Sequence, residues 1–195
     1  GRGGRGQGGP GAQTGEVTTY SGSYYLTING GTILVNAQGD GLDANGAIEM
    51  TGGVVVVNGP TESMNGALDY DGTFNISGGT LIAVGSSGMA QAPSSGSTQS
   101  AVLMNVSGQS AGTLINLQSA AGESVLTFAP AKSYASILFS SPDLAQGTTY
   151  TLNLGGSATG TSVGGLYTDG TYSGGTEYGG FTQSSVVTML GGQSR

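Results

Sequence analysis

The chain has 195 residues, of which 40 are glycine and only 8% are charged, and it contains neither cysteine nor histidine. These two absences exclude disulfides, thiolate zinc sites and catalysis that depends on an imidazole. The net charge is −7, and the only basic residues are Arg2, Arg5, Lys132 and Arg195. Because nucleic-acid binding requires a basic surface, this composition excludes a nucleic-acid partner.

Residues 1–14 (GRGGRGQGGPGAQT) consist of glycine and mostly polar residues, and they cannot bury a core of their own. We expect a flexible tail, or alternatively a segment held by a neighbouring subunit. Residues 15–195 are expected to form a single domain. Because the chain starts at Gly1 rather than at methionine, we expect it to be a processed product. No apolar run approaches the roughly 18 to 20 residues that span a bilayer, so no membrane span is expected.

The first part of this domain repeats. Glycine pairs stand at 30–31, 52–53 and 78–79. Apolar residues recur two and four positions before each pair, at Leu26 and Ile28, Ile48 and Met50, and Phe74 and Ile76. The residues between them are polar: Thr27, Glu49 and Asn75. This alternation is typical of a strand with one buried face.

The segments that follow the glycine pairs, TILV, VVVVN and TLIAV, are apolar on both faces and are expected to be buried from both sides. A fourth copy, MNVSGQ at 104–109, matches FNISGG at 74–79, and the insertion GSSGMAQAPSSGSTQS explains the longer step between them. Such self-similarity predicts an all-β solenoid, a single-domain right-handed parallel β-helix. A β-sandwich is the alternative, against which the regular register argues.

Toward the C-terminus the repeat loosens into alternating segments, SVLTF, YASILF and TYTLNL, which we expect to form the last coils. The segment GGLYTDGTYSGGTEYGGF is expected to be a Gly/Tyr-rich cap, and SSVVTML a closing strand. Tyr167, Tyr172 and Tyr178 recur within this cap. They are candidate carbohydrate-binding residues because sugar rings stack on aromatic faces, and packing within the cap is the alternative.

The same alignment places acidic residues in register, in GDGLDANG at 39–46 and in NGALDYDG at 65–72. Asp43 is expected to stack on Asp69 and Asn45 on Asp71, with Asp40 in the adjoining turn. Carboxylates about 5 Å apart repel by about 1 kcal/mol in water-like surroundings, and no Lys or Arg is nearby in sequence. Calcium takes six to eight oxygen ligands, so the pattern predicts a Ca²⁺ site at these five residues. Ordinary solvated turn residues are the alternative.

We expect no enzymatic activity. Calcium-dependent lyases built on β-helices abstract a proton with Arg or Lys beside the metal, and the acidic repeats contain neither. Lys132 is expected to lie far along the stack from them. Hydrolysis of a glycoside requires two carboxylates with opposed roles across the sugar, and no cation near the acidic residues would hold a uronate substrate.

The segments GDGLDANG, GALDYDG, GSSGMAQAPSS and YSGGTEYGG resemble those of secreted bacterial carbohydrate-binding β-helix proteins from organisms that degrade plant cell walls. The resemblance covers roughly residues 20 to 191. It implies a right-handed β-helix that binds calcium and polygalacturonate or cellulose without cleaving it, with calcium at the five residues above. The first coil departs from the pattern, because Ser21 and Ser23 stand where carboxylates could stand.

Two functional hypotheses follow. In the first, the chain is secreted to the extracellular space or cell surface and binds an acidic plant polysaccharide, polygalacturonate-like, through bridging calcium. In the second, it is the subunit of an extracellular fibre that assembles head-to-tail through its β-helix ends. In that fibre Arg2 and Arg5 of the tail would meet the acidic body of the next subunit.

Overall fold

The structure, a computed structural model, describes residues 24–191. The predicted tail at 1–14, and Ser21 and Ser23 of the first repeat, lie outside these residues. Every regular element within residues 24–191 is a β-strand, so the predicted all-β class is confirmed. The described part of the chain contains no helix with the length and apolarity that crossing a bilayer requires.

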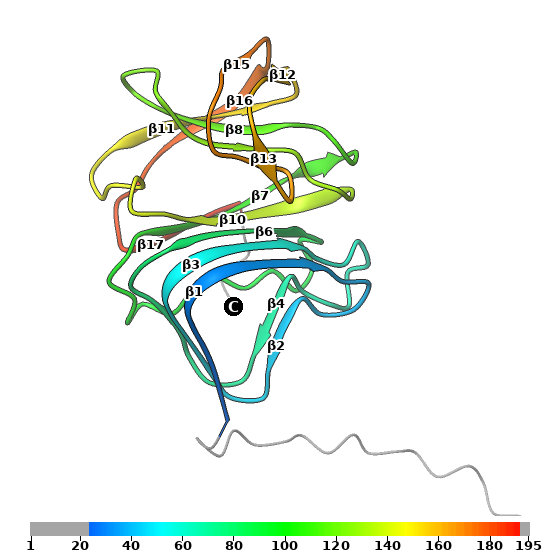
Figure 1. Cartoon of the computed structure of the whole chain (residues 1–195), viewed down its shortest axis with the longest axis vertical. Helices are drawn as coiled ribbons and strands as arrows, with labels where there is room; N and C mark the ends of the chain where they lie inside the picture. The colour runs from blue at the N-terminus through cyan, green and yellow to red at the C-terminus, as the bar shows by residue number, and fades with distance from the viewer. Residues whose placement is uncertain (1–23, 192–195) are drawn as a thin grey trace, which may run out of the picture.

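Two sheets make up most of the fold (Figure 1). The large sheet has the strand order β1-β3-β6-β10-β7-β17, with β5 also paired to β3. Its strands are β1 (Tyr25–Asn36), β3 (Ala47–Asn58), β5 (Phe74–Ile76), β6 (Thr80–Gly85), β7 (Ala101–Gln109), β10 (Tyr134–Ser140) and β17 (Val187–Leu190). Figure 1 shows this sheet across the middle of the molecule.

The second, outer sheet has the order β13-β14-β9-β8-β11-β16. Its strands are β8 (Ile115–Ser119), β9 (Ser124–Phe128), β11 (Thr149–Leu154), β13 (Ser162–Val163), β14 (Leu166–Tyr167) and β16 (Thr176–Thr182). Two smaller pairs complete the described structure: β2 (Leu42–Ala44) with β4 (Leu68–Tyr70), and β12 (Ser157–Ala158) with β15 (Tyr172–Ser173).

The predicted repeat is confirmed for the first part of the domain. Strands β1, β3 and β6 are parallel, and β3 also pairs with β5 in parallel. Ile28 lies beside Met50, and Met50 lies beside Ile76, as the alignment on the glycine pairs requires. The spacing of the glycine pairs therefore sets the register of the strands.

The parallel arrangement ends after β6, and two predictions are wrong here. The predicted fourth copy does not stack on the third: β10 lies between β6 and β7 and is antiparallel to both. The segments SVLTF, YASILF and TYTLNL do form strands β9, β10 and β11, but these pair antiparallel rather than as further parallel coils. The predicted closing strand is confirmed as β17, which runs parallel to β7. The domain thus combines parallel repeats with an antiparallel sandwich.

The predicted insertion explains why the repeats stop. Its residues 91–99, here called the capping segment, occupy the positions where a fourth repeat would hydrogen-bond. The hydroxyl of Ser94 accepts a hydrogen bond from Phe74 N at 3.0 Å, and that of Ser97 accepts one from Ile76 N at 3.1 Å. Gln99 donates through Nε2 to the carbonyl oxygen of Gly79 at 2.9 Å. An open strand edge is thereby satisfied without another strand.

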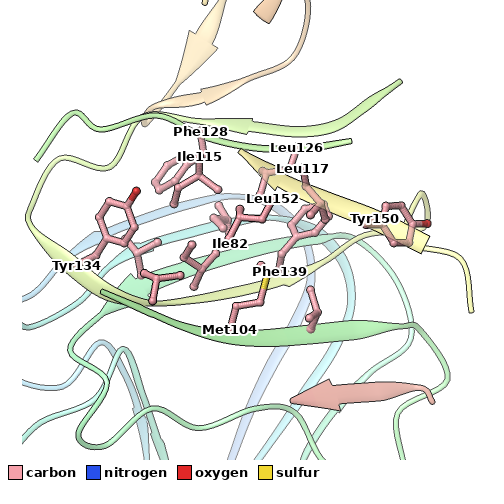
Figure 2. Close-up of a cluster of buried hydrophobic side chains, with 14 of the residues drawn as sticks. Ile82, Met104, Ile115, Leu117, Leu126, Phe128, Tyr134, Phe139, Tyr150 and Leu152 are labelled. Carbon is pink, nitrogen blue, oxygen red and sulfur yellow. The ribbon is translucent and has the colours of Figure 1, made fainter. Parts of the chain in front are cut away.

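The large sheet separates two apolar cores, as predicted for segments that are apolar on both faces. On one face Val55, Leu81 and Leu103 pack with the residues of β2, β4 and β5. On the other face, the side chains pack against the outer sheet. Figure 2 shows this second core, with Ile82, Met104 and Phe139 from the large sheet and Ile115, Leu117, Leu126, Phe128 and Leu152 from the outer sheet.

The stacked corners leave no room for a side chain. A Cβ added at Gly78 would lie 2.4 Å from the carbonyl oxygen of Thr51 in the repeat below, closer than any real contact. We therefore expect Gly78→Ala to destabilise the fold by about 1–3 kcal/mol. Gly108→Ala on β7 is the matched control, because nothing lies within 4 Å of its added Cβ. Thermal and denaturant unfolding measure both, and equal stability of the two variants would contradict the close approach.

Candidate functional site

The predicted acidic column is built by the short parallel strands β2 and β4. Asp43 lies beside Asp69 in register. Leu42 and Leu68, the preceding residues on each strand, are buried in the core. Because successive side chains of a strand point to opposite faces, the two aspartates face away from the core.

The register continues beyond the strands. Asp71 N donates to the carbonyl oxygen of Ala44 at 3.2 Å, and Gly72 N donates to that of Gly46 at 2.9 Å. Asn45 and Asp71, both exposed, therefore occupy corresponding positions on neighbouring repeats. The stack of Asp43 on Asp69 and of Asn45 on Asp71 agrees with the sequence alignment.

Asp40 joins the column from the adjoining turn. Its Oδ1 accepts a hydrogen bond from Gly66 N at 2.7 Å, in the corresponding turn of the next repeat. Gly41 N also donates to the carbonyl oxygen of Gly66 at 3.0 Å. One oxygen of Asp40 therefore links two repeats, and the other oxygen has no protein partner in the described residues.

The electrostatics of the column are unfavourable without a cation. Partial burial raises the pKa of Asp69 above its ordinary value of 3.8, and the neighbouring charges of Asp40, Asp43 and Asp71 raise it further. These three carboxylates thus lie close enough to Asp69 to repel its charge. Desolvation and like charges both disfavour an ionised carboxylate, so this site gains from any bound cation.

Lys132 lies closer to the column than the sequence predicts. It is the only basic residue among residues 24–191, and its Nζ donates to the carbonyl oxygen of Ala37, shortly before Asp40 in the chain. The expectation that Lys132 lies far along the stack is therefore wrong. The loop between β9 and β10 carries it there because Ala131 N donates to Oδ1 of Asn58 at 2.8 Å, which fixes this loop against the end of β3.

The donor set of the column suits a hard divalent cation. Its side chains offer carboxylate and amide oxygens, which calcium prefers, and no sulfur or nitrogen ligand competes. Among the described residues, no three acidic side chains form a group that could hold a metal ion by themselves. Asp40, Asp43, Asn45, Asp69 and Asp71 could hold part of a calcium coordination shell, and other oxygens would complete it.

The three candidate tyrosines do not form one surface. Tyr167 lies on β14 and Tyr178 on β16, which are separated in the outer sheet by β9, β8 and β11. Four strand spacings correspond to about 19 Å. Tyr172 lies on β15, outside that sheet, and its hydroxyl donates to the carbonyl oxygen of Gly155 at 3.0 Å. Their regular spacing in sequence therefore reflects the short strands rather than a common face.

Tyr178 is the most exposed of the three. Its hydroxyl accepts a hydrogen bond from Ser107 N at 2.8 Å, and hydrogen bonding to Ser107 lowers the pKa of Tyr178. Burial raises the pKa of Tyr172. The hydroxyls of Tyr172 and Tyr178 thus have partners within the protein, and of the three rings that of Tyr178 is the most open to a sugar.

Sequence reasoning missed the support that Tyr70 gives to the column. Tyr70 lies between Asp69 and Asp71, and its hydroxyl donates to the carbonyl oxygen of Ala92 in the capping segment at 2.6 Å. Tyr70 N donates to Oε1 of Gln91 at 3.3 Å. The alternation of LDYD indicates that this ring points inward, but no sequence signal identifies its partners in the insertion.

Comparison of the chain with family models, with curated proteins and with solved structures found no match.

Replacing Asp69 by Asn tests the repulsion within the column. Because the folded-state pKa of Asp69 is raised, the folded protein binds its proton more tightly than the unfolded chain. Stability from this group is therefore present below pH 3.8 and is lost as the pH rises through the folded-state pKa. In chelator, we expect Asp69→Asn to melt at a higher temperature than the wild type at pH 7, with a difference that shrinks toward pH 3.

The control for this measurement is Glu123→Gln, since Glu123 is exposed just before β9 and away from the column. This substitution should leave the change in melting temperature between pH 7 and pH 3 the same as in the wild type. A melting temperature of Asp69→Asn below that of the wild type at pH 7 would show that the neighbouring carboxylates do not repel.

Proposed function

We propose that the chain is a secreted, non-catalytic calcium-binding protein, extracellular or at the cell surface, that attaches to an acidic polysaccharide of the polygalacturonate type. The observation that carries this proposal is the in-register stack of Asp43 on Asp69. Asp40 and Asp71 add to it, and their charges raise the pKa of Asp69. A site with this excess of negative charge is suited to a divalent cation.

The proposed binding mechanism is a mixed coordination shell. Calcium takes six to eight oxygen ligands, and adjacent carboxylates on neighbouring repeats supply only part of them. Uronate carboxylates of the polysaccharide would supply others. Without the cation, a chain of net charge −7 repels a polyuronate, so the attachment depends on calcium.

The proposed fold for residues 25–85 is a right-handed parallel β-helix. Strands β1, β3 and β6 are parallel neighbours in one sheet, and each is joined to the next by a crossover connection that includes β2 or β4. Such connections are right-handed in about 98% of known cases. This spiral keeps corresponding turns of successive repeats on one side of the molecule, where the acidic column lies.

The proposal of a non-catalytic role rests on residue types. Lys132 is the basic residue nearest the column in the described structure, and its Nζ is engaged by the carbonyl oxygen of Ala37. No arginine occurs between residues 24 and 191. The alternative hypothesis of a head-to-tail fibre depends on the tail at 1–14, which lies outside the described residues, and it stays a prediction.

Polygalacturonate pull-down tests this function. We expect the wild type to be retained on the insoluble polymer in calcium and released by chelator. The double variant Asp43→Asn with Asp69→Asn should bind no better in calcium than the wild type does in chelator, because the column loses two stacked ligands. Glu123→Gln should be retained normally. The calcium bridge is refuted if the polymer does not retain the wild type, or if chelator does not release it.

A further inference from the structure

The first strand of the large sheet has an open edge. Within residues 24–191, β1 pairs with β3 on one side and with no strand on the other. It is 12 residues long and contains no charged residue and no proline. Tyr24, Tyr25 and Leu34 are 61%, 68% and 53% exposed. Natural proteins block such edges with charges, proline, bulges or a covering segment. In the described structure β1 has no charge, no proline and no covering segment, and its irregularity is confined to the register shift between Ile28 and Thr32.

Other strand edges in the described structure are blocked, short or charged: β16, the seven-residue strand at one edge of the outer sheet, carries Glu177. The capping segment covers β5 through Ser94 and Ser97. At the opposite edge of the large sheet, β17 has only four residues, and β13 at one edge of the outer sheet has two. The long open edge of β1 is therefore a distinct feature that calls for a partner.

The burial pattern of β1 is symmetric about the corner formed by Gly30 and Gly31. Half-buried or buried residues lie at equal distances on either side, and exposed residues lie between them. The inward pairs are Leu26 with Val35 and Ile28 with Ile33, and the outward pairs are Tyr25 with Asn36, Thr27 with Leu34, and Asn29 with Thr32. Reversing the direction of β1 therefore leaves its pattern of inward and outward residues unchanged.

From this symmetry we propose that two copies of the chain pair antiparallel through β1, about a two-fold axis at the Gly30–Gly31 corner. Residues directly opposite each other in an antiparallel pair point to the same face. Ile28 would then face Ile33 of the second copy within a shared apolar interior. Thr27 would face Leu34 of the second copy on the other face, where the side chain of Leu34 also lies beside Gly164 of the turn between β13 and β14. Such an interface is isologous, so the assembly closes as a dimer.

The bend in β1 fits the same axis. The register of β1 with β3 shifts between Ile28 and Thr32, which divides the strand into two arms that meet at the corner. A two-fold axis that bisects this corner exchanges the two arms and reverses the strand direction. The bent edge of one copy can therefore follow the bent edge of the other along its full length. In a head-to-tail arrangement, β1 would instead pair with β17 at the opposite edge of the large sheet of the next copy. Because β17 has only four residues, most of β1 would stay uncovered.

The preceding part of the chain is a poor alternative occupant. If a further repeat preceded β1 at the spacing that separates Gly30 from Gly52, the positions beside the four inward residues of β1 would be Gly4, Gly6, Gly11 and Gln13. These residues offer no apolar side chain to continue the core, and glycine is unfavourable within strands. A second β1, by contrast, offers aliphatic residues at all four inward positions.

Light scattering after size exclusion tests this dimer, in chelator so that the proposed calcium site plays no part. We expect the full chain to have twice its 19.0 kDa mass. Thr27→Lys with Leu34→Lys would place like charges opposite each other twice across the axis and should give the monomer mass. Thr27→Lys with Leu34→Glu changes the same two positions but places opposite charges across the axis. Unlike the double-lysine variant, it should have the dimer mass.

A second measurement checks the register independently of charge. The chain has no cysteine, so Thr27→Cys with Leu34→Cys should form a covalent dimer on oxidation, whereas Thr27→Cys alone should form little. A wild type of monomer mass throughout the micromolar range would overturn the proposal. So would equal dimerisation of the two charge variants, a series of higher oligomers, or failure of the paired cysteines to crosslink. Failure of calcium-dependent binding to polygalacturonate would leave all of these outcomes unchanged.

Discussion

The in-register parallel pairing of β1, β3 and β6 is the constraint on which the rest of the structure depends. It brings backbones so close at the corners that Gly78 has no space for a side chain. The same register places Asp43 beside Asp69. One geometric requirement therefore produces both the tight core and the charged surface. The repulsion between the carboxylates opposes folding, and the apolar contacts of the inner core offset it.

The sequence predicts the parallel part of the fold well because its information is local and repeated. Glycine pairs and alternating apolar residues set strand, face and register together, and so the alignment of the repeats alone places Asp43 and Asp69 side by side. Lys132 could not be placed in this way, because its position depends on a hydrogen bond between Ala131 and Asn58, which are far apart in the chain. No periodicity encodes such a contact.

The sequence pattern also does not predict the change from parallel repeats to an antiparallel sandwich. The match of MNVSGQ to FNISGG is real as a local strand pattern, since both segments lie in or next to strands of the large sheet. Alternation specifies which face of a strand is buried, but it does not specify the neighbouring strand. The deciding residues are in the capping segment, where Ser94, Ser97 and Gln99 use their side chains as hydrogen-bonding partners. A serine-rich insertion is typical of a loop, and its composition does not identify the backbone groups that it will bind.

The capping segment could also end a stack with a different number of parallel repeats. It contacts the backbone of the last repeat near Phe74, Ile76 and Gly79, and much of this contact is with N–H and carbonyl groups that any repeat of this type presents. An extra unit inserted before Phe74 would therefore meet the same cap. Each added repeat with aspartates at the corresponding positions would extend the acidic column, while the sandwich beyond the cap would stay unchanged.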